Sequence, residues 1–179
     1  MPATTTDLRY PIGKFSFPES ASAAQIAEWI NDIERAPAAL RAAVKGLSAT
    51  QIETPYRSGG WTVRQVVHHL ADSHINAYAR FKLALTEETP TIKPYDEAAW
   101  ANLDDSRVVP IAVSLDLLDA LHTRWIALIR SMSPQQMQRD FRHPEHGRVL
   151  RLDATLALYA WHGKHHVAHI TTLREREGW

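Results

Sequence analysis

Apolar residues recur at intervals of three and four positions along four long stretches of the chain, which is the spacing of amphipathic helices. The first stretch begins at a capping box that opens with Ser22, and Pro37 predicts a kink or a restart within it. The second opens with a capping box at Thr62 and predicts a helix over residues 63–86. Ser114 is the expected cap of the third helix, so the pattern predicts a mainly helical protein.

The segments between these stretches predict connections. Residues 1–19 hold several prolines among aromatic side chains and indicate an extended arm. An irregular crossing leads from Pro90 to Pro110, and a connection of that length is usually functional or flexible. After a short helical turn at residues 133–136, a polar loop precedes the fourth helix, which Asp153 is expected to cap and which ends near residue 176.

The composition fits one globular domain that spans residues 1–179. Hydrophobic residues make up 45% of the chain and charged residues 22%, which is ordinary for a soluble protein with a real core. Four amphipathic helices, one long crossing between the second and third, and little strand signal favour a helix bundle. We therefore predict an all-α four-helix bundle with an extended N-terminal arm.

Charge and cysteine content exclude several classes of function. Lys plus Arg and Asp plus Glu both number 20, so the basic excess typical of a nucleic-acid-binding protein is missing. No apolar run approaches a membrane span, and the N-terminus lacks the pattern of a signal peptide, so we expect a cytoplasmic protein without membrane contact. The absence of cysteine excludes disulfides, thiolate metal sites and a cysteine nucleophile.

Four histidines fall within residues 162–169, and His162 and His166 are four positions apart on the predicted last helix. That spacing places two imidazoles on one helix face, where they can bind a single metal ion. Helical facing puts His166 about 40° and His162 about 80° from the apolar direction. His169 lies further out, at about 100°, and His165 points mostly to solvent at about 140°. The pattern favours His162 and His166 as ligands.

A third histidine should come from the predicted helix over residues 63–86, and the pattern leaves two candidates. His74 lies near the apolar direction of that helix, whereas His69 lies on a polar stripe about 120° away that could line a central cavity. Periodicity alone does not choose between them. Further histidines are expected on the surface, in a loop or behind the ligands: His68, His122, His143, His146 and His165. A zincin protease is excluded, because Gly163 stands where that motif needs glutamate.

Two histidine-containing segments, Trp61–His74 and Trp161–Ile170, resemble the two histidine motifs of the DinB superfamily. The segments Asp7–Phe15 and Tyr95–Trp100 resemble the YfiT-like branch of that family, whose members are described as metal-dependent hydrolases. The resemblance covers almost the whole chain. It implies an up-down-down-up four-helix bundle that is often a homodimer.

The resemblance also implies the ligands and the chemistry of the site. It assigns a divalent metal ion to His69, His162 and His166 and chooses His69 over His74. Imidazole ligands suit Zn²⁺, which we expect, and also Ni²⁺ or another first-row ion. Where the family commonly has Arg-Gly-Gln after the last ligand, this chain has Val-Ala-His, which leaves the role of His169 open.

Three hypotheses for the function stay open. The YfiT-like branch implies a hydrolase in which the metal activates water for attack on a small-molecule substrate. Related branches imply a bacillithiol-type thiol S-transferase, and since the chain has no cysteine, that thiol would arrive as a cosubstrate. The third hypothesis is a metal-binding stress protein without catalytic activity.

Other residues are weaker candidates for the chemistry. Asp72 and Glu97 are candidates for the general base, because Asp72 lies on the same predicted helix as His69 and Glu97 lies in the irregular crossing that carries Tyr95 and Trp100. Arg80 could anchor an anionic substrate, although a structural ion pair explains it equally well. Tyr95 and Trp100 could cover the metal as a lid.

Overall fold

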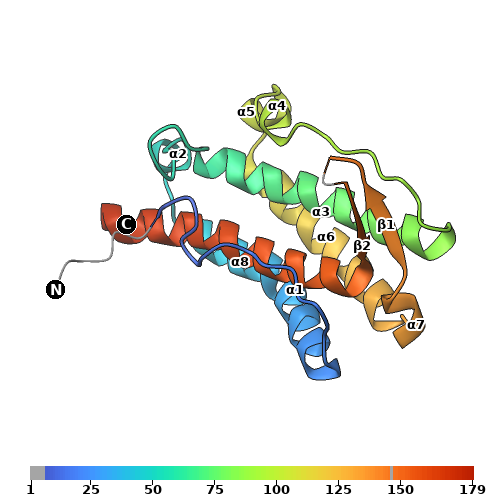
Figure 1. Cartoon of the computed structure of the whole chain (residues 1–179). Helices are drawn as coiled ribbons and strands as arrows, with labels where there is room; N and C mark the ends of the chain where they lie inside the picture. Colours follow the sequence, from blue (N-terminus) through green and yellow to red (C-terminus); the bar gives the residue numbers. More distant parts are fainter. Residues whose placement is uncertain (1–6, 146) are drawn as a thin grey trace.

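Four long helices form the body of the molecule in a computed structural model that describes residues 7–145 and 147–179. They are α1 (Ala23–Val44), α3 (Val63–Thr86), α6 (Ile111–Arg130) and α8 (Leu152–Glu177). Followed from their N-termini, α1 and α8 run in one direction and α3 and α6 in the other (Figure 1). The predicted up-down-down-up four-helix bundle is confirmed, with one small two-stranded sheet added to it.

Local capping signals set several helix starts. The hydroxyls of Ser22 and Thr62 accept hydrogen bonds from backbone N–H groups three residues later, and each box opens its helix as predicted. The box at Ser133 opens the single turn α7 (Pro134–Met137). A further box at Ser48 opens the single turn α2 (Ala49–Ile52), which the apolar pattern does not predict because one turn is too short to show a period.

Pro37 lies inside α1, and the predicted restart of the helix there is wrong. The helix continues through Pro37, which is buried. Proline has no N–H, so the carbonyl of Ile33, four residues earlier, loses its usual helical partner. The Nδ1 atom of His122 lies 2.8 Å from that carbonyl oxygen and supplies the hydrogen bond instead. A tertiary contact therefore compensates the defect that the proline makes in the helix.

Two predicted caps lie inside their helices. Helix α6 begins three residues before Ser114, directly after Pro110. Ser114 is buried within the helix, where its hydroxyl lies 2.7 Å from Nδ1 of His68. Helix α8 begins one residue before Asp153, whose carboxylate accepts a hydrogen bond from the next backbone N–H at 2.7 Å in the first turn. Both residues act as hydrogen-bond partners but neither is the N-cap.

The predicted polar loop before α8 is a β-hairpin. Strands β1 (Asp140–His143) and β2 (Arg148–Arg151) are antiparallel, and Phe141 pairs with Leu150, both buried against the bundle. The connection between α3 and α6 lies beside β1, because Ile92 N–H donates to the carbonyl of Arg142 at 3.1 Å. His146, predicted to lie in the loop, is outside the described residues.

That connection, the predicted irregular crossing, contains two single-turn helices, α4 (Glu97–Trp100) and α5 (Asp105–Val108). The N-terminal arm from residue 7 to residue 21 has no helix or strand and runs across α8, as Figure 1 shows. In the part of the chain that the structure describes, no helix is long and apolar enough to cross a membrane.

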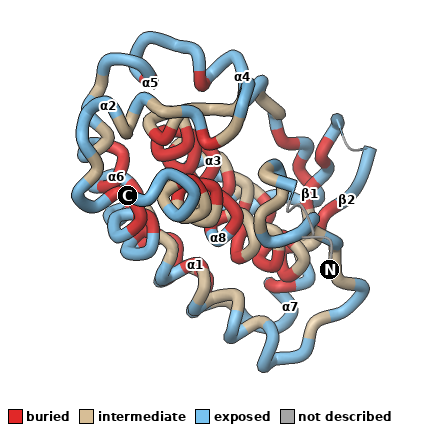
Figure 2. Tube along the Cα trace, turned by 90° about the vertical axis from the view of Figure 1, so that its left-hand side faces the viewer, coloured by how far each residue is buried: buried red, intermediate tan, exposed pale blue. Residues whose placement is uncertain are grey.

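Buried residues follow the inward faces of the long helices (Figure 2) and form two apolar clusters. One cluster is built around Phe81 and Trp125, and the other around Val67 and Leu118. Helices α3, α6 and α8 also carry buried histidines, namely His68, His69, His74, His122, His165, His166 and His169, and half-buried His162 packs against three of them. The bundle thus has a polar layer of imidazoles in its middle, and the candidate site is built from it.

Candidate metal centre

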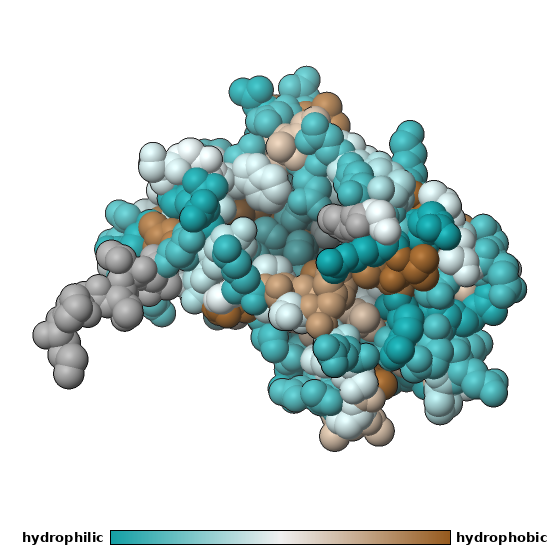
Figure 3. All heavy atoms as spheres, in the orientation of Figure 1, coloured by the Kyte–Doolittle hydropathy of each residue, from teal (hydrophilic) through white to brown (hydrophobic). Residues whose placement is uncertain are grey.

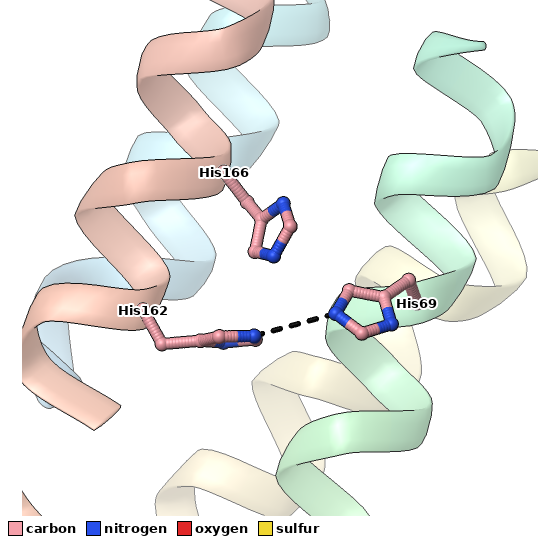
Figure 4. Close-up of side chains that lie close together, drawn as sticks. All are labelled: His69, His162 and His166. Carbon is pink, nitrogen blue, oxygen red and sulfur yellow. Dashed lines mark hydrogen bonds between the residues drawn. The ribbon is translucent and has the colours of Figure 1, made fainter. Parts of the chain in front are cut away.

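Three histidines from two helices point toward one another in the middle of the bundle (Figure 4). His69 comes from α3, and His162 and His166 come from successive turns of α8. Each offers one ring nitrogen, and these nitrogens all lie within 4.8 Å of one another. The structure therefore brings together the three residues that the family resemblance implied.

The spacing of the nitrogens fits a metal ion. The Nε2 atoms of His69 and His162 are 3.3 Å apart. In a tetrahedral zinc site each histidine nitrogen lies about 2.0–2.1 Å from the ion, which separates two such nitrogens by about 3.3 Å. The pair is thus already at the distance that two zinc ligands need.

The protonation of the three imidazoles also fits. Burial lowers the pKa of His69 to about 4 and holds the pKa values of His162 and His166 well below the ordinary value, and neighbouring histidines lower them further. All three rings are therefore neutral near pH 7. A metal ion binds neutral imidazole through its lone pair, so no proton has to be removed from a charged ring first.

The three histidines line one cavity of about 820 Å³. Its remaining wall is rich in aromatic side chains, namely Tyr10, Phe17, Tyr56, Trp61, Tyr95, Phe141, Tyr159 and Trp161. Charged side chains also line it, namely Arg9, Arg57, Arg80, Glu97 and Glu145. The face shown in Figure 3 is mostly hydrophilic and is hollowed near its centre. This volume is in the range of pockets that hold small molecules.

The three predicted catalytic candidates lie in different places. Glu97 and Arg80 line the cavity, and an Nη1–H of Arg80 donates to the hydroxyl of Tyr159 at 3.3 Å. Asp72 is half-buried on α3 but is not part of the cavity wall. Burial, aided by the charge of Asp105, raises the pKa of Asp72 to about 6. The catalytic roles of these residues stay predictions.

His165 is buried, and the prediction that it points to solvent is wrong. Its ring stacks on Trp161, with centroids 4.2 Å apart, and the ring of Tyr10, in the N-terminal arm, lies 6.0 Å from the His165 ring. Facing on an isolated helix could not reveal this, because the arm covers that side of α8. His169 is also buried, because Nε2 of its ring lies 3.2 Å from the backbone carbonyl of Arg9 in the arm and the ring stacks on Tyr56 at 3.9 Å.

The other histidines that the structure describes lie in the interior. His74 is a hydrogen-bonded core residue, as predicted. His68 and His122 are both buried, so neither lies on the surface. His143 ends strand β1, is buried and lines the cavity, although a solvated loop was expected there. The signal missed in the sequence is the alternation of residues 140–143, which buries every second side chain.

Tyr95 and Trp100, the two aromatic residues predicted to cover the metal, lie in different environments. Tyr95 lines the cavity, whereas Trp100 is 39% exposed and packs on Tyr95 with ring centroids 4.4 Å apart. Tyr95 could therefore cover the three histidines directly, whereas Trp100 could act only by packing on Tyr95. Arg9 and Tyr10 of the arm also line the cavity. Nothing in the periodicity of the helices singled out these two residues.

The fold and the site together define a class of protein, namely up-down-down-up helix bundles with three converging histidines at a cavity. The chain belongs to the DinB superfamily, whose family model matches residues 32–170. It is 53% identical to the Bacillus subtilis (strain 168) protein named "putative metal-dependent hydrolase YfiT", over 98% of this chain and 99% of that one. A protein of Bacillus mycoides (strain KBAB4) with the same type of name is 55% identical, over 97% and 99%.

A solved structure shares the fold. The structure of YfiT from Bacillus subtilis aligns with a TM-score of 0.94 and 54% identity, over 96% of this chain and 98% of that one. It is described as "a probable metal-dependent hydrolase with an unusual four-helix bundle topology". The resemblance inferred from the two histidine segments is thus confirmed.

Proposed function

We propose that this protein is a metal-dependent hydrolase in which His69, His162 and His166 hold one divalent metal ion at the wall of the cavity. The observation that carries the proposal is the convergence of three neutral imidazoles, two of them buried and that of His162 half-buried, at a cavity of about 820 Å³, with the Nε2 atoms of His69 and His162 3.3 Å apart. Zn²⁺ is the ion we propose, and Ni²⁺ or another first-row ion would suit the same ligands. The names of the relatives support the same activity.

Three protein ligands leave a coordination position open, which is the mark of a catalytic site. When bound, the ion would supply Lewis-acid chemistry and a water molecule acidic enough to act as a nucleophile near neutral pH. The chain's own contribution is to keep the ligands neutral and fixed, and to shape a cavity that receives a small-molecule substrate beside them.

Glu97 is the side chain that we assign to proton transfer. It lines the same cavity as the three histidines, whereas Asp72 does not. A general base has to reach the proton that it accepts, so position decides before pKa. Arg80, held by the Tyr159 hydroxyl, presents a positive charge to the cavity and would bind an anionic group of the substrate.

The experiment is to incubate Zn²⁺-loaded protein with a panel of small esters, amides and epoxides, with and without a small thiol. We expect cleavage that does not need the thiol, stops on chelation and returns with added Zn²⁺. Adduct formation that needs the thiol would show an S-transferase instead, and the absence of turnover across the panel would favour a metal-binding protein without catalysis. Either result would overturn the proposal.

Two amide variants form a matched pair in the same assay. Glu97→Gln should lower turnover by about 10²–10⁴-fold, the usual contribution of a general base, without changing the Zn²⁺ content. Asp72→Asn should leave turnover within a few-fold of the wild type. Equal turnover in the two variants would remove Glu97 from the proposed role.

A further inference from the structure

We infer that two relays of buried histidines fix which ring nitrogen of His162 and of His166 carries the proton, and that each relay ends on a backbone carbonyl outside the ligand helices. The first runs through His74 and His122, and the second through His169. These are positioning residues, because they act on the ligands and are not among the three histidines that would hold the ion. The inference rests on the proposed metal site but not on the reaction.

The first relay starts at Pro37. Because Pro37 has no N–H, the carbonyl of Ile33 is without a donor from its own helix. A carbonyl oxygen can only accept a hydrogen bond, and Nδ1 of His122 lies 2.8 Å from it. Nδ1 of His122 must therefore carry the proton.

Each following step is fixed by the one before, since a neutral imidazole has one donor and one acceptor nitrogen. Nε2 of His122 is then the acceptor, and Nδ1 of His74, 2.7 Å away, must donate to it. Nε2 of His74 becomes the acceptor for Nδ1 of His162 at 3.3 Å. His162 therefore keeps its proton on Nδ1 and presents a bare Nε2 toward His69.

The alternation needs every ring in the relay to be neutral. Burial lowers the pKa of His122 to about 4. His74 is 1% exposed, and its ring is packed among His122, Trp125, Tyr159 and His162, none of which could balance a positive charge. Neither ring is charged near pH 7, so the order of donors and acceptors is preserved. In the metal-free protein His69 must then supply the proton of its 3.3 Å contact with His162.

The second relay serves the other ligand of α8. The backbone carbonyl of Arg9, in the N-terminal arm, lies 3.2 Å from Nε2 of His169, which must donate to it. Nδ1 of His169 is then the acceptor for Nδ1 of His166, 3.4 Å away. His166 keeps its proton on Nδ1, and its Nε2 is bare. Position 169, where this chain departs from the common family pattern, thus gains a defined role.

The relays matter because a ligand in the wrong tautomer has no lone pair to offer at Nε2. Partners that fix the tautomer and orientation of a ligating histidine typically change metal affinity by about 10–100-fold when they are mutated. His122 is the point to test, since it joins the Ile33 carbonyl to His74 and contacts neither the cavity nor a ligand.

The first experiment measures the Zn²⁺ dissociation constant by chelator competition in the full-length protein. His122→Phe removes both ring nitrogens and should weaken binding by about 10–100-fold. His122→Gln, whose amide can accept from His74 and donate to Ile33, should restore most of the loss. His68→Phe is the matched control, because His68 is also buried and hydrogen-bonded but belongs to neither relay. Unchanged binding in His122→Phe would overturn the inference.

The second experiment needs no variant to fold. Long-range ¹H–¹⁵N NMR of the metal-free wild type distinguishes the protonated from the bare nitrogen in each imidazole. We expect Nδ1–H in His74, His122, His162 and His166, and Nε2–H in His169. Nε2–H in His162 would contradict the inference. Both readouts are independent of turnover, so a failure of the proposed hydrolase activity would leave them unaffected.

Discussion

Mild acid should destabilise the metal-free protein, because its folded state excludes protons that the unfolded chain takes up. His69 and His122 are each 3% exposed, and burial lowers the pKa of each from 6.5 to about 4. Below pH 6.5 the unfolded chain binds a proton at each site and the folded chain does not. The stability is therefore fully present above pH 6.5 and is lost as the pH falls from there toward 4.

The size of the loss follows from the pKa difference. One pH unit below 6.5 costs about 1.4 kcal/mol for each histidine, so lowering the pH from 7.5 to 5.5 costs about 2.8 kcal/mol for His69 and His122 together. His74, His162 and His166, whose pKa values are also lowered, act in the same direction. This is a large share of the roughly 5–15 kcal/mol that stabilises a typical domain.

One carboxyl acts in the opposite direction. The pKa of Asp72 is raised from 3.8 to about 6, so the folded chain takes up that proton before the unfolded chain does, and this group adds stability as the pH falls through 6 toward 3.8. Asp72 is only half-buried, which weakens its effect relative to the fully buried histidines. The net change should remain destabilising.

The assay is urea unfolding of the chelator-treated protein at pH 7.5 and 5.5, followed by tryptophan fluorescence and far-ultraviolet circular dichroism. The denaturant slope should stay constant while the free energy of unfolding falls. His122→Gln is the matched variant, because it removes one titrating site and should reduce the pH-dependent loss by about 1.4 kcal/mol. Constant or rising stability between pH 7.5 and 5.5, or a loss that His122→Gln leaves unchanged, would refute the reasoning.

Two substitutions test the packing around the histidine layer. Phe81→Ala, in the apolar cluster built around Phe81 and Trp125, should lower the free energy of unfolding in urea by about 3–5 kcal/mol, while the protein still binds one Zn²⁺. A decrease below about 1 kcal/mol would contradict the described core. At Gly163 an added Cβ would lie 3.1 Å from Cβ of Ala36 on α1. Overpacking of this kind costs about 1–3 kcal/mol, whereas alanine gains about 1 kcal/mol over glycine in helix propensity. Gly163→Ala should therefore lower the free energy of unfolding by an amount on the order of 1 kcal/mol. A variant more stable than the wild type would show that α1 moves aside freely.

Local signals in the sequence predicted much of the bundle. The capping box at Thr62 and the apolar period after it predicted residues 63–86, the bounds of α3 in the structure. The spacing of His162 and His166 predicted a shared helix face, since four residues return to the same side of a helix. These features depend on neighbours within one or two turns, which is the range over which a sequence pattern is informative.

The features that the sequence did not predict depend on contacts between distant segments. His69 and His74 could not be separated by periodicity, because both are buried, one toward the cavity and the other toward the core. His165 was misplaced because the N-terminal arm covers its side of α8. Pro37 suggested a helix break because its compensating partner, His122, comes from another helix. The predicted homodimer stays a prediction.

Metal content measured on matched variants tests the central claim most directly. Elemental analysis of Zn²⁺-loaded, desalted protein should find one equivalent in the wild type and in His165→Ala, since His165 is a buried neighbour that is not among the three converging histidines. His162→Ala should lose most of that equivalent, because two imidazoles from different helices hold an ion far less tightly than three. A full equivalent of zinc in His162→Ala would contradict the assignment of the site to His69, His162 and His166.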